Sequence, residues 1–324
     1  MATATVAGRD TETWTHRLRD VGFWAEWAAL VGLVILVIVF QIANPTFLSS
    51  GNISSMLVAA AILVILAVGQ TFVVSTGGID LSVASIMTFG AVVFGLTYTS
   101  GWGVLGSSLA ALVAGTVVGA VNGVIIARGK ITDFIVTLGM LSAASGAALV
   151  LADGKPVTII DTTLLKLSTG GLGIFGWTVI IAACVALIAH GLLFHTRFGT
   201  HVLATGGSAE AATATGISTA RIKIAVYTMS GLLAGLGAIL LIARVGAAEP
   251  ASNTSFLLNS VAAVVLGGVS LLGGRGTITG PVIGALLLTA LTNGLTLLGV
   301  SQFYQPLAVG VVVVLAALLT RFQK

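Results

Sequence analysis

Long apolar segments, separated by short polar or glycine-rich breaks, run through nearly the whole chain. A helix of about 20 apolar residues is long enough to cross the hydrocarbon core of a membrane. Ten segments near that length are predicted, at residues 25–43, 53–76, 82–99, 104–127, 132–151, 176–195, 221–243, 256–272, 277–298 and 304–320. The pattern therefore predicts an all-α, polytopic integral membrane protein with about ten transmembrane helices.

Glycine changes this simple picture in two ways. Glycine-rich breaks fall within 53–99 and 256–298, where they could mark re-entrant or interrupted helices instead of full crossings. Elsewhere glycine recurs every fourth residue, at Gly115, Gly119 and Gly123 and again at Gly231 and Gly235. Such a stripe of small residues lets two helices approach closely, and we expect packing within the chain here in preference to a dimer interface.

The composition excludes a soluble globular protein. Hydrophobic residues make up 57% of the 324 residues and charged residues only 7%, whereas soluble domains carry about 25% charged residues. The mean hydropathy is +1.13. Cys184 is the single cysteine, so neither a disulfide within the chain nor a cysteine-rich metal site is expected.

The distribution of basic residues predicts the orientation of the spans, because Lys and Arg in short loops favour the cytoplasm. With a cytoplasmic N-terminus and ten spans, only Lys155, Lys166 and Arg244 of the 14 basic residues lie outside. The other eleven are cytoplasmic: Arg9, Arg17, Arg19, Arg128, Lys130, Arg197, Arg221, Lys223, Arg275, Arg321 and Lys324. Residues 1–24 then form a cytoplasmic N-terminal tail, residues 25–320 form a single membrane domain, and the net charge of +4 reflects topology, not a nucleic-acid partner.

The longest polar stretch within the membrane domain is a predicted cytoplasmic loop at 196–220, and it contains a short capped helix. Ser208 is suited to the N-cap, Glu210 falls in the first turn and Gly216 can adopt the left-handed conformation that ends a helix. About two turns of helix are not stable alone in water, so we expect this helix to dock against something.

Several motifs resemble one family. The run Gly-Gln-Thr-Phe-Val-Val-Ser-Thr-Gly-Gly-Ile-Asp-Leu-Ser-Val at 69–83 closely resembles a run shared by permeases of ribose, xylose and arabinose ABC importers, and 123–139 is similar to the same family. Glu210-Ala211-Ala212, with Gly216 after it, resembles the coupling loop of ABC importer permeases. The resemblance continues in order from about Ile53 onward.

This resemblance implies the permease fold and a set of partners. They are a second permease chain in a homodimer or heterodimer, an ATPase subunit on the cytoplasmic side, and an extracytoplasmic sugar-binding protein, assembled at the inner membrane. The chain contains no Gly-x-x-x-x-Gly-Lys-Ser/Thr loop, so we expect it to bind no cofactor, with ATP and Mg²⁺ held by the partner ATPase. The residues implied in ATPase coupling are Ser208, Glu210, Ala211, Ala212 and Gly216.

Polar and aromatic residues inside the spans are candidates for the path of a monosaccharide. The set comprises Gln70, Thr71, Phe72, Ser75, Asp80, Asn122, Phe134, Asn259 and Asn293, with Thr137, Ser142, Ser260 and Thr296 as further neutral hydrogen-bonding groups. For each one, a structural role is the alternative, because such side chains also bond their own helix backbone or a neighbouring helix. Asp80 could either cap the helix that follows the 76–82 break or face the path.

Other functions remain open on the sequence alone. An ion-coupled secondary carrier for a small neutral solute would need an ionisable group deep in the membrane, and no predicted span carries one at its middle. A channel-like or structural subunit is a second alternative. Within the ABC family, a nucleoside, an autoinducer or a branched-chain amino acid could replace the sugar.

Overall fold

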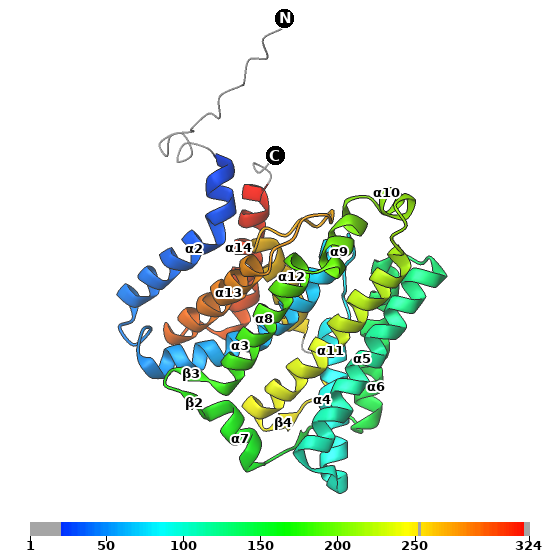
Figure 1. Cartoon of the computed structure of the whole chain (residues 1–324). Helices are drawn as coiled ribbons and strands as arrows, with labels where there is room; N and C mark the ends of the chain where they lie inside the picture. The colour runs from blue at the N-terminus through cyan, green and yellow to red at the C-terminus, as the bar shows by residue number, and fades with distance from the viewer. Residues whose placement is uncertain (1–20, 252–253, 321–324) are drawn as a thin grey trace, which may run out of the picture.

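The computed structural model describes residues 21–251 and 254–320, which form a bundle of tilted helices (Figure 1). The apolar helices are α2 (Val21–Ala43), α3 (Ser50–Ser75), α4 (Val83–Thr97), α5 (Gly103–Gly129), α6 (Asp133–Leu151), α8 (Trp177–Phe194), α11 (Thr219–Val245), α12 (Thr254–Leu266), α13 (Thr279–Leu297) and α14 (Gln305–Thr320). Shorter elements connect them: the π-helix η1 (Tyr98–Trp102), α7 (Thr162–Thr169), α9 (Arg197–Gly207), α10 (Ala209–Ala214) and the 3-10 helix η2 (Gln302–Tyr304). Strand β1 (Val157–Thr158) pairs with β4 (Ala247–Ala248), and β2 (Gly171–Leu172) pairs with β3 (Phe175–Gly176), both antiparallel.

The predicted fold class is confirmed in the part of the chain that the structure describes. Six helical stretches are long and apolar enough to cross a membrane: Ser50–Ser75, Val83–Gly129, Asp133–Leu151, Trp177–Phe194, Thr219–Val245 and Thr279–Leu297. The second of these contains both α4 and α5, which reverse direction at Gly101 and Gly103 and pack against each other. Three shorter apolar stretches follow, at Ala29–Ala43, Thr254–Leu266 and Gln302–Leu315.

Helices are interrupted in both regions where the glycine pattern suggested it. Residues 76–82 are non-helical between α3 and α4, and residues 267–278 are non-helical between α12 and α13. The span predicted over 256–272 is helical only as far as Leu266, where α12 ends; after it, Gly268 and Gly273 adopt positive φ angles of 75° and 82°. The two interruptions meet where the backbone N–H of Gly274 donates to the carbonyl of Ser75 at 3.0 Å.

The glycine stripes pack against each other inside the chain, which confirms that expectation. A Cβ added to Gly115 would overlap the carbonyl oxygen of Gly231, and one added to Gly119 would lie 2.9 Å from the Cα of Gly231. The backbones of α5 and α11 therefore touch directly, as small residues allow in membrane helices. α3 lies at the centre of the fold, where it packs against α11, α13, α8 and α12.

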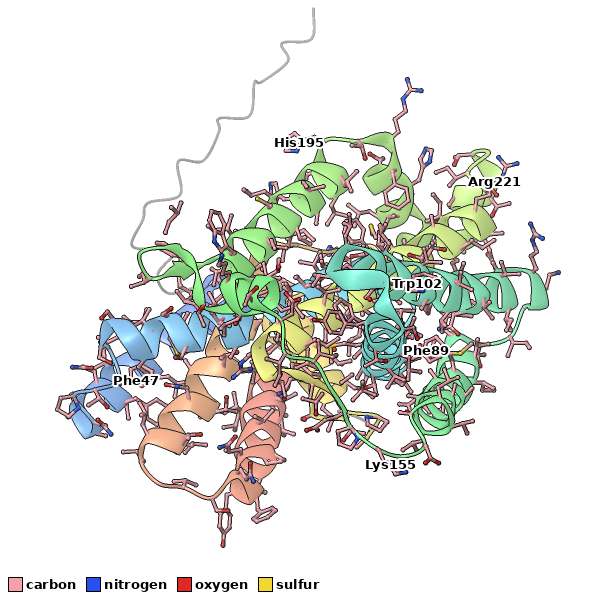
Figure 2. The ribbon with its side chains drawn as sticks, turned by 90° about the horizontal axis from the view of Figure 1, so that it is seen from below. Phe47, Phe89, Trp102, Lys155, His195 and Arg221 are labelled. Atoms are coloured by element: carbon pink, nitrogen blue, oxygen red, sulfur yellow. The ribbon has the colours of Figure 1, made fainter. Side chains whose placement is uncertain are left out.

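The arrangement of loops gives the molecule two distinct ends. In Figure 1, α10, the start of α2 and the end of α14 lie at the upper end, while α7 and β4 lie at the lower end. Figure 2 shows the molecule from below, with the lower end of Figure 1 facing the reader. α10, predicted to be cytoplasmic, and α7, which contains Lys166 and is predicted to be extracytoplasmic, thus lie at opposite ends of the bundle. Of the predicted N-terminal tail, residues 1–20 lie outside the described residues.

Candidate functional site

The loop between α8 and α11 contains the short capped helix that the sequence predicts. The hydroxyl of Ser208 accepts a hydrogen bond from the N–H of Ala211 at 3.2 Å, Glu210 lies in the first turn of α10, and Gly216 has a φ of 87°. The preceding helix α9 was not predicted. It begins after Thr196, whose hydroxyl accepts from the N–H of Gly199 at 3.3 Å, so a Thr cap was the signal that could have located it.

The two faces of α10 differ in exposure. Glu210 and Ala211 are exposed, as are Ser208 and Gly216, whereas Ala212 is buried. Among the residues assigned to coupling, Ala212 therefore attaches α10 to its own chain, and the other four remain at the surface. α10 leads into α11 after a turn of four residues, 215–218.

The interruption between α3 and α4 holds a fully buried carboxylate, that of Asp80. Its Oδ1 accepts from the N–H of Ser82 at 2.9 Å and from the Ser82 hydroxyl at 2.6 Å. Its Oδ2 accepts from the hydroxyl of Ser230, on α11, at 2.9 Å. The N-cap position of α4 is Ser82, which has no side-chain cap bond, so the bond from the Ser82 backbone to Asp80 forms a turn just before the helix and does not cap it directly.

Two buried amides complete this network. Gln70 Nε2 donates to the carbonyl of Asp80 at 3.1 Å, and Asn122 Nδ2 donates to the Ser82 hydroxyl at 2.9 Å. Their oxygens, Gln70 Oε1 and Asn122 Oδ1, are buried and have no hydrogen-bond partner among the residues that the structure describes. Three of the proposed path residues, Gln70, Asp80 and Asn122, are thus brought together by α3, α5 and the segment before α4.

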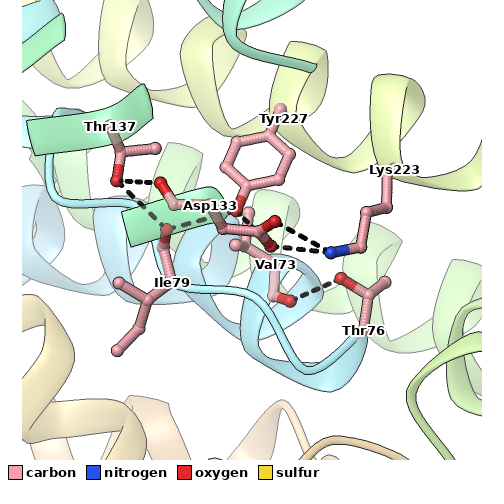
Figure 3. A network of polar contacts seen from close by, with 7 residues as sticks. All are labelled: Val73, Thr76, Ile79, Asp133, Thr137, Lys223 and Tyr227. Atoms are coloured by element: carbon pink, nitrogen blue, oxygen red, sulfur yellow. Dashed lines mark hydrogen bonds and ion pairs between the residues drawn. The ribbon is translucent and has the colours of Figure 1, made fainter. Parts of the chain in front are cut away.

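A second polar network lies beside the same interruption (Figure 3). Lys223, on α11, forms an ion pair with Asp133, on α6, with Nζ 2.9 Å from Oδ1 and 2.8 Å from Oδ2. The hydroxyl of Tyr227 lies 2.9 Å from Asp133 Oδ2 and 3.1 Å from the carbonyl oxygen of Ile79. Thr137, also on α6, donates to the carbonyl of Asp133 in its own helix at 2.8 Å and lies 3.3 Å from the carbonyl of Ile79. The backbone at Ile79 therefore contacts both α6 and α11.

This second network was missed from the sequence. Asp133 and Lys223 each lie near the cytoplasmic start of a predicted span, and opposite charges at such positions are a signal for an ion pair. Nothing in the sequence order showed which two spans are neighbours, because the residues are 90 positions apart. Gly78 gives further evidence of close contact: a Cβ there would overlap Asp133 Oδ2 and lie 2.8 Å from the Tyr227 hydroxyl.

A cavity of about 340 Å³ lies between the ion pair and the start of α10. Its lining includes Thr76, Asp133, Ala209, Thr219 and Lys223. The cavity thus touches the end of α3, the start of α6, the first residue of α10 and the first turns of α11. None of the nine proposed path residues lines it.

The remaining path candidates do not form one cluster: three are on α3, and the other three are on α6, α12 and α13. Thr71 donates to the carbonyl of Ala67 in its own helix, Phe72 is buried with its ring centroid 6.2 Å from that of Phe198, and Ser75 is buried near Gly276. Asn293 and Asn52 bond each other through their side-chain amides. Asn259 is partly buried, and Phe134 is 56% exposed. The role of this set in translocation stays a prediction.

Comparisons with known proteins give the class of the chain. A family model described as branched-chain amino acid transport system / permease component matches residues 52–319. The ribose import permease protein RbsC of Escherichia coli K12 is 38% identical over 331 residues, which cover 98% of each chain. The RbsC protein of Bacillus subtilis is 38% identical over 96% of this chain and 97% of its own length. The L-arabinose ABC transporter permease AraH of Azospirillum brasilense is 35% identical over 90% and 86%.

The chain is a membrane permease of the ABC importer class. It belongs to the permease family whose model matches residues 52–319, which confirms the resemblance drawn from the 69–83 and 123–139 motifs. No solved structure matches the chain significantly.

Proposed function

We propose that the chain is the transmembrane permease subunit of an ATP-driven importer that translocates a monosaccharide. The observation that carries this proposal is the 38% identity to a ribose import permease over 98% of both chains. A relative named for L-arabinose is similar over 90% of this chain. An ion-coupled secondary carrier is not favoured, because the relatives named above are a ribose import permease and a permease of an L-arabinose ABC transporter.

The proposed assembly contains a second permease chain, an ATPase subunit and an extracytoplasmic sugar-binding protein. We assign the ATPase contact to the exposed face of α10, around Glu210 and Ala211, with Ser208 and Gly216 fixing the two ends of the helix. A short exposed helix attached through a single buried residue, Ala212, is suited to docking into a groove of a partner. ATP and Mg²⁺ are then bound by the partner, since this chain lacks a phosphate-binding loop.

The proposed location is the inner membrane, with both termini in the cytoplasm. Eleven of the 14 Lys and Arg residues fall on the cytoplasmic side in this orientation. It also puts α10 on the side where ATP is available.

Substrate uptake tests the proposal. The chain is co-expressed and purified with its ATPase, reconstituted in proteoliposomes with ATP inside, and supplied with its binding protein and labelled ribose, xylose, arabinose, leucine or a nucleoside. We expect ATP-dependent accumulation of one of the monosaccharides. Accumulation of leucine or the nucleoside alone would assign a different substrate class, and uptake that follows an ion gradient without ATP would overturn the proposal.

A further inference from the structure

Three residues on one face of α11 contact the segment between α3 and α4, or the carboxylate of Asp133, which packs against that segment. Lys223, Tyr227 and Ser230 follow one another at spacings of four and three residues, which places them on the same side of a helix. Lys223 donates to Asp133, the single hydroxyl proton of Tyr227 is shared between Asp133 and the carbonyl oxygen of Ile79, and Ser230 donates to Asp80. The segment Thr76–Ser82 is therefore tied to α11 at two consecutive residues, Ile79 and Asp80.

The contacts of Asp80, Tyr227 and Ser230 are protected from water, whereas the Lys223–Asp133 ion pair borders the cavity. Asp80, Tyr227 and Ser230 are fully buried, and the side chains of Asp133 and Lys223 are 14% and 25% exposed. Hydrogen bonds to charged groups in such surroundings are strong, and a partner left without its bond carries the full cost of desolvation. A displacement of α11 that broke them would leave buried polar groups unpaired. Movement of α11 together with the Thr76–Ser82 segment keeps them paired.

α11 is also joined closely to α10 and to α5. Only residues 215–218 separate α10 from α11, and Ala209, Thr219 and Lys223 line the same cavity. Along its next turns α11 packs backbone to backbone on α5, where a Cβ on Gly119 would overlap the carbonyl of Tyr227. Such packing resists sliding of one helix along the other, since the backbones leave no free space. A force applied at α10 is therefore expected to move α11 and α5 as a unit.

We propose that Tyr227 and Ser230, with the Lys223–Asp133 ion pair, are positioning residues that transmit displacement of α10 to the Thr76–Ser82 segment during transport. The inference rests on the proposed function, because it requires that α10 contacts an ATPase. The inference gives the two polar networks, around Asp80 and around Asp133, a role other than substrate contact or helix capping. When the start of α11 moves, these networks make the Thr76–Ser82 segment move with it. Gly78 fits this role, since its lack of a side chain lets the segment lie directly against Asp133 and Tyr227.

The test is the number of sugar molecules imported per ATP hydrolysed by the complete importer in proteoliposomes. Tyr227→Phe keeps the buried ring and removes only the hydroxyl that bonds Ile79 and Asp133. We expect the number of sugar molecules imported per ATP to fall about fivefold or more. A factor of about five is the lower end of the typical range for coupling between two sites. Ser230→Ala, which releases Asp80 with a smaller change in volume, should lower the ratio in the same direction and provides the test if Tyr227→Phe does not fold.

Tyr98→Phe is the matched control, because the Tyr98 hydroxyl also donates to a carboxylate, that of Asp161, at 2.9 Å. That bond lies near β1 and α7, at the other end of the molecule from α10. A merely structural role of Tyr227 would lower the amount of folded importer, and both uptake and hydrolysis with it, leaving their ratio equal to that of the wild type. An unchanged ratio in Tyr227→Phe and Ser230→Ala would overturn the inference alone, whereas absence of ATP-dependent uptake by the wild-type complex would overturn the proposed function and the inference together.

Discussion

The hydroxyl of Ser230 lies 2.9 Å from Oδ2 of Asp80, across 150 residues of sequence. Asp80 also accepts two bonds from Ser82, so three donors converge on one buried carboxylate. A buried charge in a membrane protein is costly unless its surroundings satisfy it, which makes this site sensitive to the loss of either partner. The same carboxylate joins Ser82, the residue before α4, to Ser230 on α11.

Two replacements of Asp80 should therefore distinguish how much its charge and its hydrogen-bond-accepting oxygens each contribute to stability. Asp80→Leu leaves the two donors of Ser82 and the hydroxyl of Ser230 unpaired, and should destabilise the protein by on the order of 3 kcal/mol, at about 1 kcal/mol or more for each buried donor. Asp80→Asn retains an acceptor for Ser82 and should cost about 1 kcal/mol. Thermal unfolding of the purified permease measures both.

The control for this pair is Asp153→Asn, which removes a charge from a side chain that is 86% exposed. It should leave stability within about 0.5 kcal/mol of the wild type. Equal stability of Asp80→Leu and Asp80→Asn would show that the hydrogen bonds to Ser82 and Ser230 contribute nothing. An Asp80→Asn protein that is stable, assembles with the ATPase and fails to import sugar would instead give the charge itself a role in transport.

Gly119 should tolerate no side chain. A Cβ there would overlap the carbonyl oxygen of Tyr227 and lie 2.9 Å from the Cα of Gly231, so Gly119→Ala must separate α5 from α11. We expect the yield of folded protein to fall strongly and its unfolding temperature to drop. Gly146→Ala, on α6, is the control: nothing lies within 4 Å of its Cβ position, and alanine should stabilise the helix by about 0.5–1 kcal/mol. Similar behaviour of the two variants would contradict the close packing of α5 on α11.

The stability of α7, the helix that we propose to be extracytoplasmic, should depend on pH through its cap. The N–H of Thr163, 2.7 Å from Asp161 Oδ1, and the hydroxyl of Tyr98 hold the pKa of Asp161 below its usual 3.8. Because this pKa is lowered on folding, the ionised Asp161 stabilises the folded state fully at pH values above 3.8. This stabilisation is lost as the pH falls through the pKa that Asp161 has in the folded protein. Hydrogen-exchange protection of α7 should therefore be weaker in Asp161→Ala than in the wild type at pH 7, and the difference should shrink in acid. A difference that persists unchanged at the lowest pH tested would show that ionisation of Asp161 is irrelevant to the cap.

Labelling of single cysteines tests the orientation. In a Cys184→Ser background, Lys155→Cys should react in intact cells with a thiol reagent that does not cross membranes. Thr213→Cys, on the exposed helix α10, should react only after the cells are opened, because the distribution of Lys and Arg assigns α10 to the cytoplasm. Reaction of Thr213→Cys in intact cells would invert the topology and separate α10 from any cytoplasmic ATPase.

Much of the architecture could be predicted because it depends on local sequence. Apolar length predicted the helices, and Ser208, Glu210 and Gly216 predicted α10 through capping rules that act over a few residues. The spacing of Gly115 and Gly119 likewise predicted close helix packing. Each of these signals lies within a single helix or its ends.

The polar networks could not be predicted in the same way, because they depend on which helices are neighbours. Asp133 and Lys223 are 90 residues apart, and Asp80 and Ser230 are 150 residues apart. Hydropathy identifies spans without giving their order in space, so neither pair could be assigned. Phe72 is predicted from its aromatic ring as a sugar contact; in the fold it is buried beside Phe198, and its role in translocation stays a prediction.

The most direct test of the central claim, that α10 couples this permease to ATP hydrolysis, is the ATPase rate of the complete importer with and without sugar-loaded binding protein. Ala211→Arg adds a large side chain to the exposed face of α10, and Gly216→Leu places a side chain at a φ of 87°, where leucine is strained. Both variants should insert in the membrane and lose the stimulation by loaded binding protein that the wild type shows. Full stimulation in both variants would contradict the account.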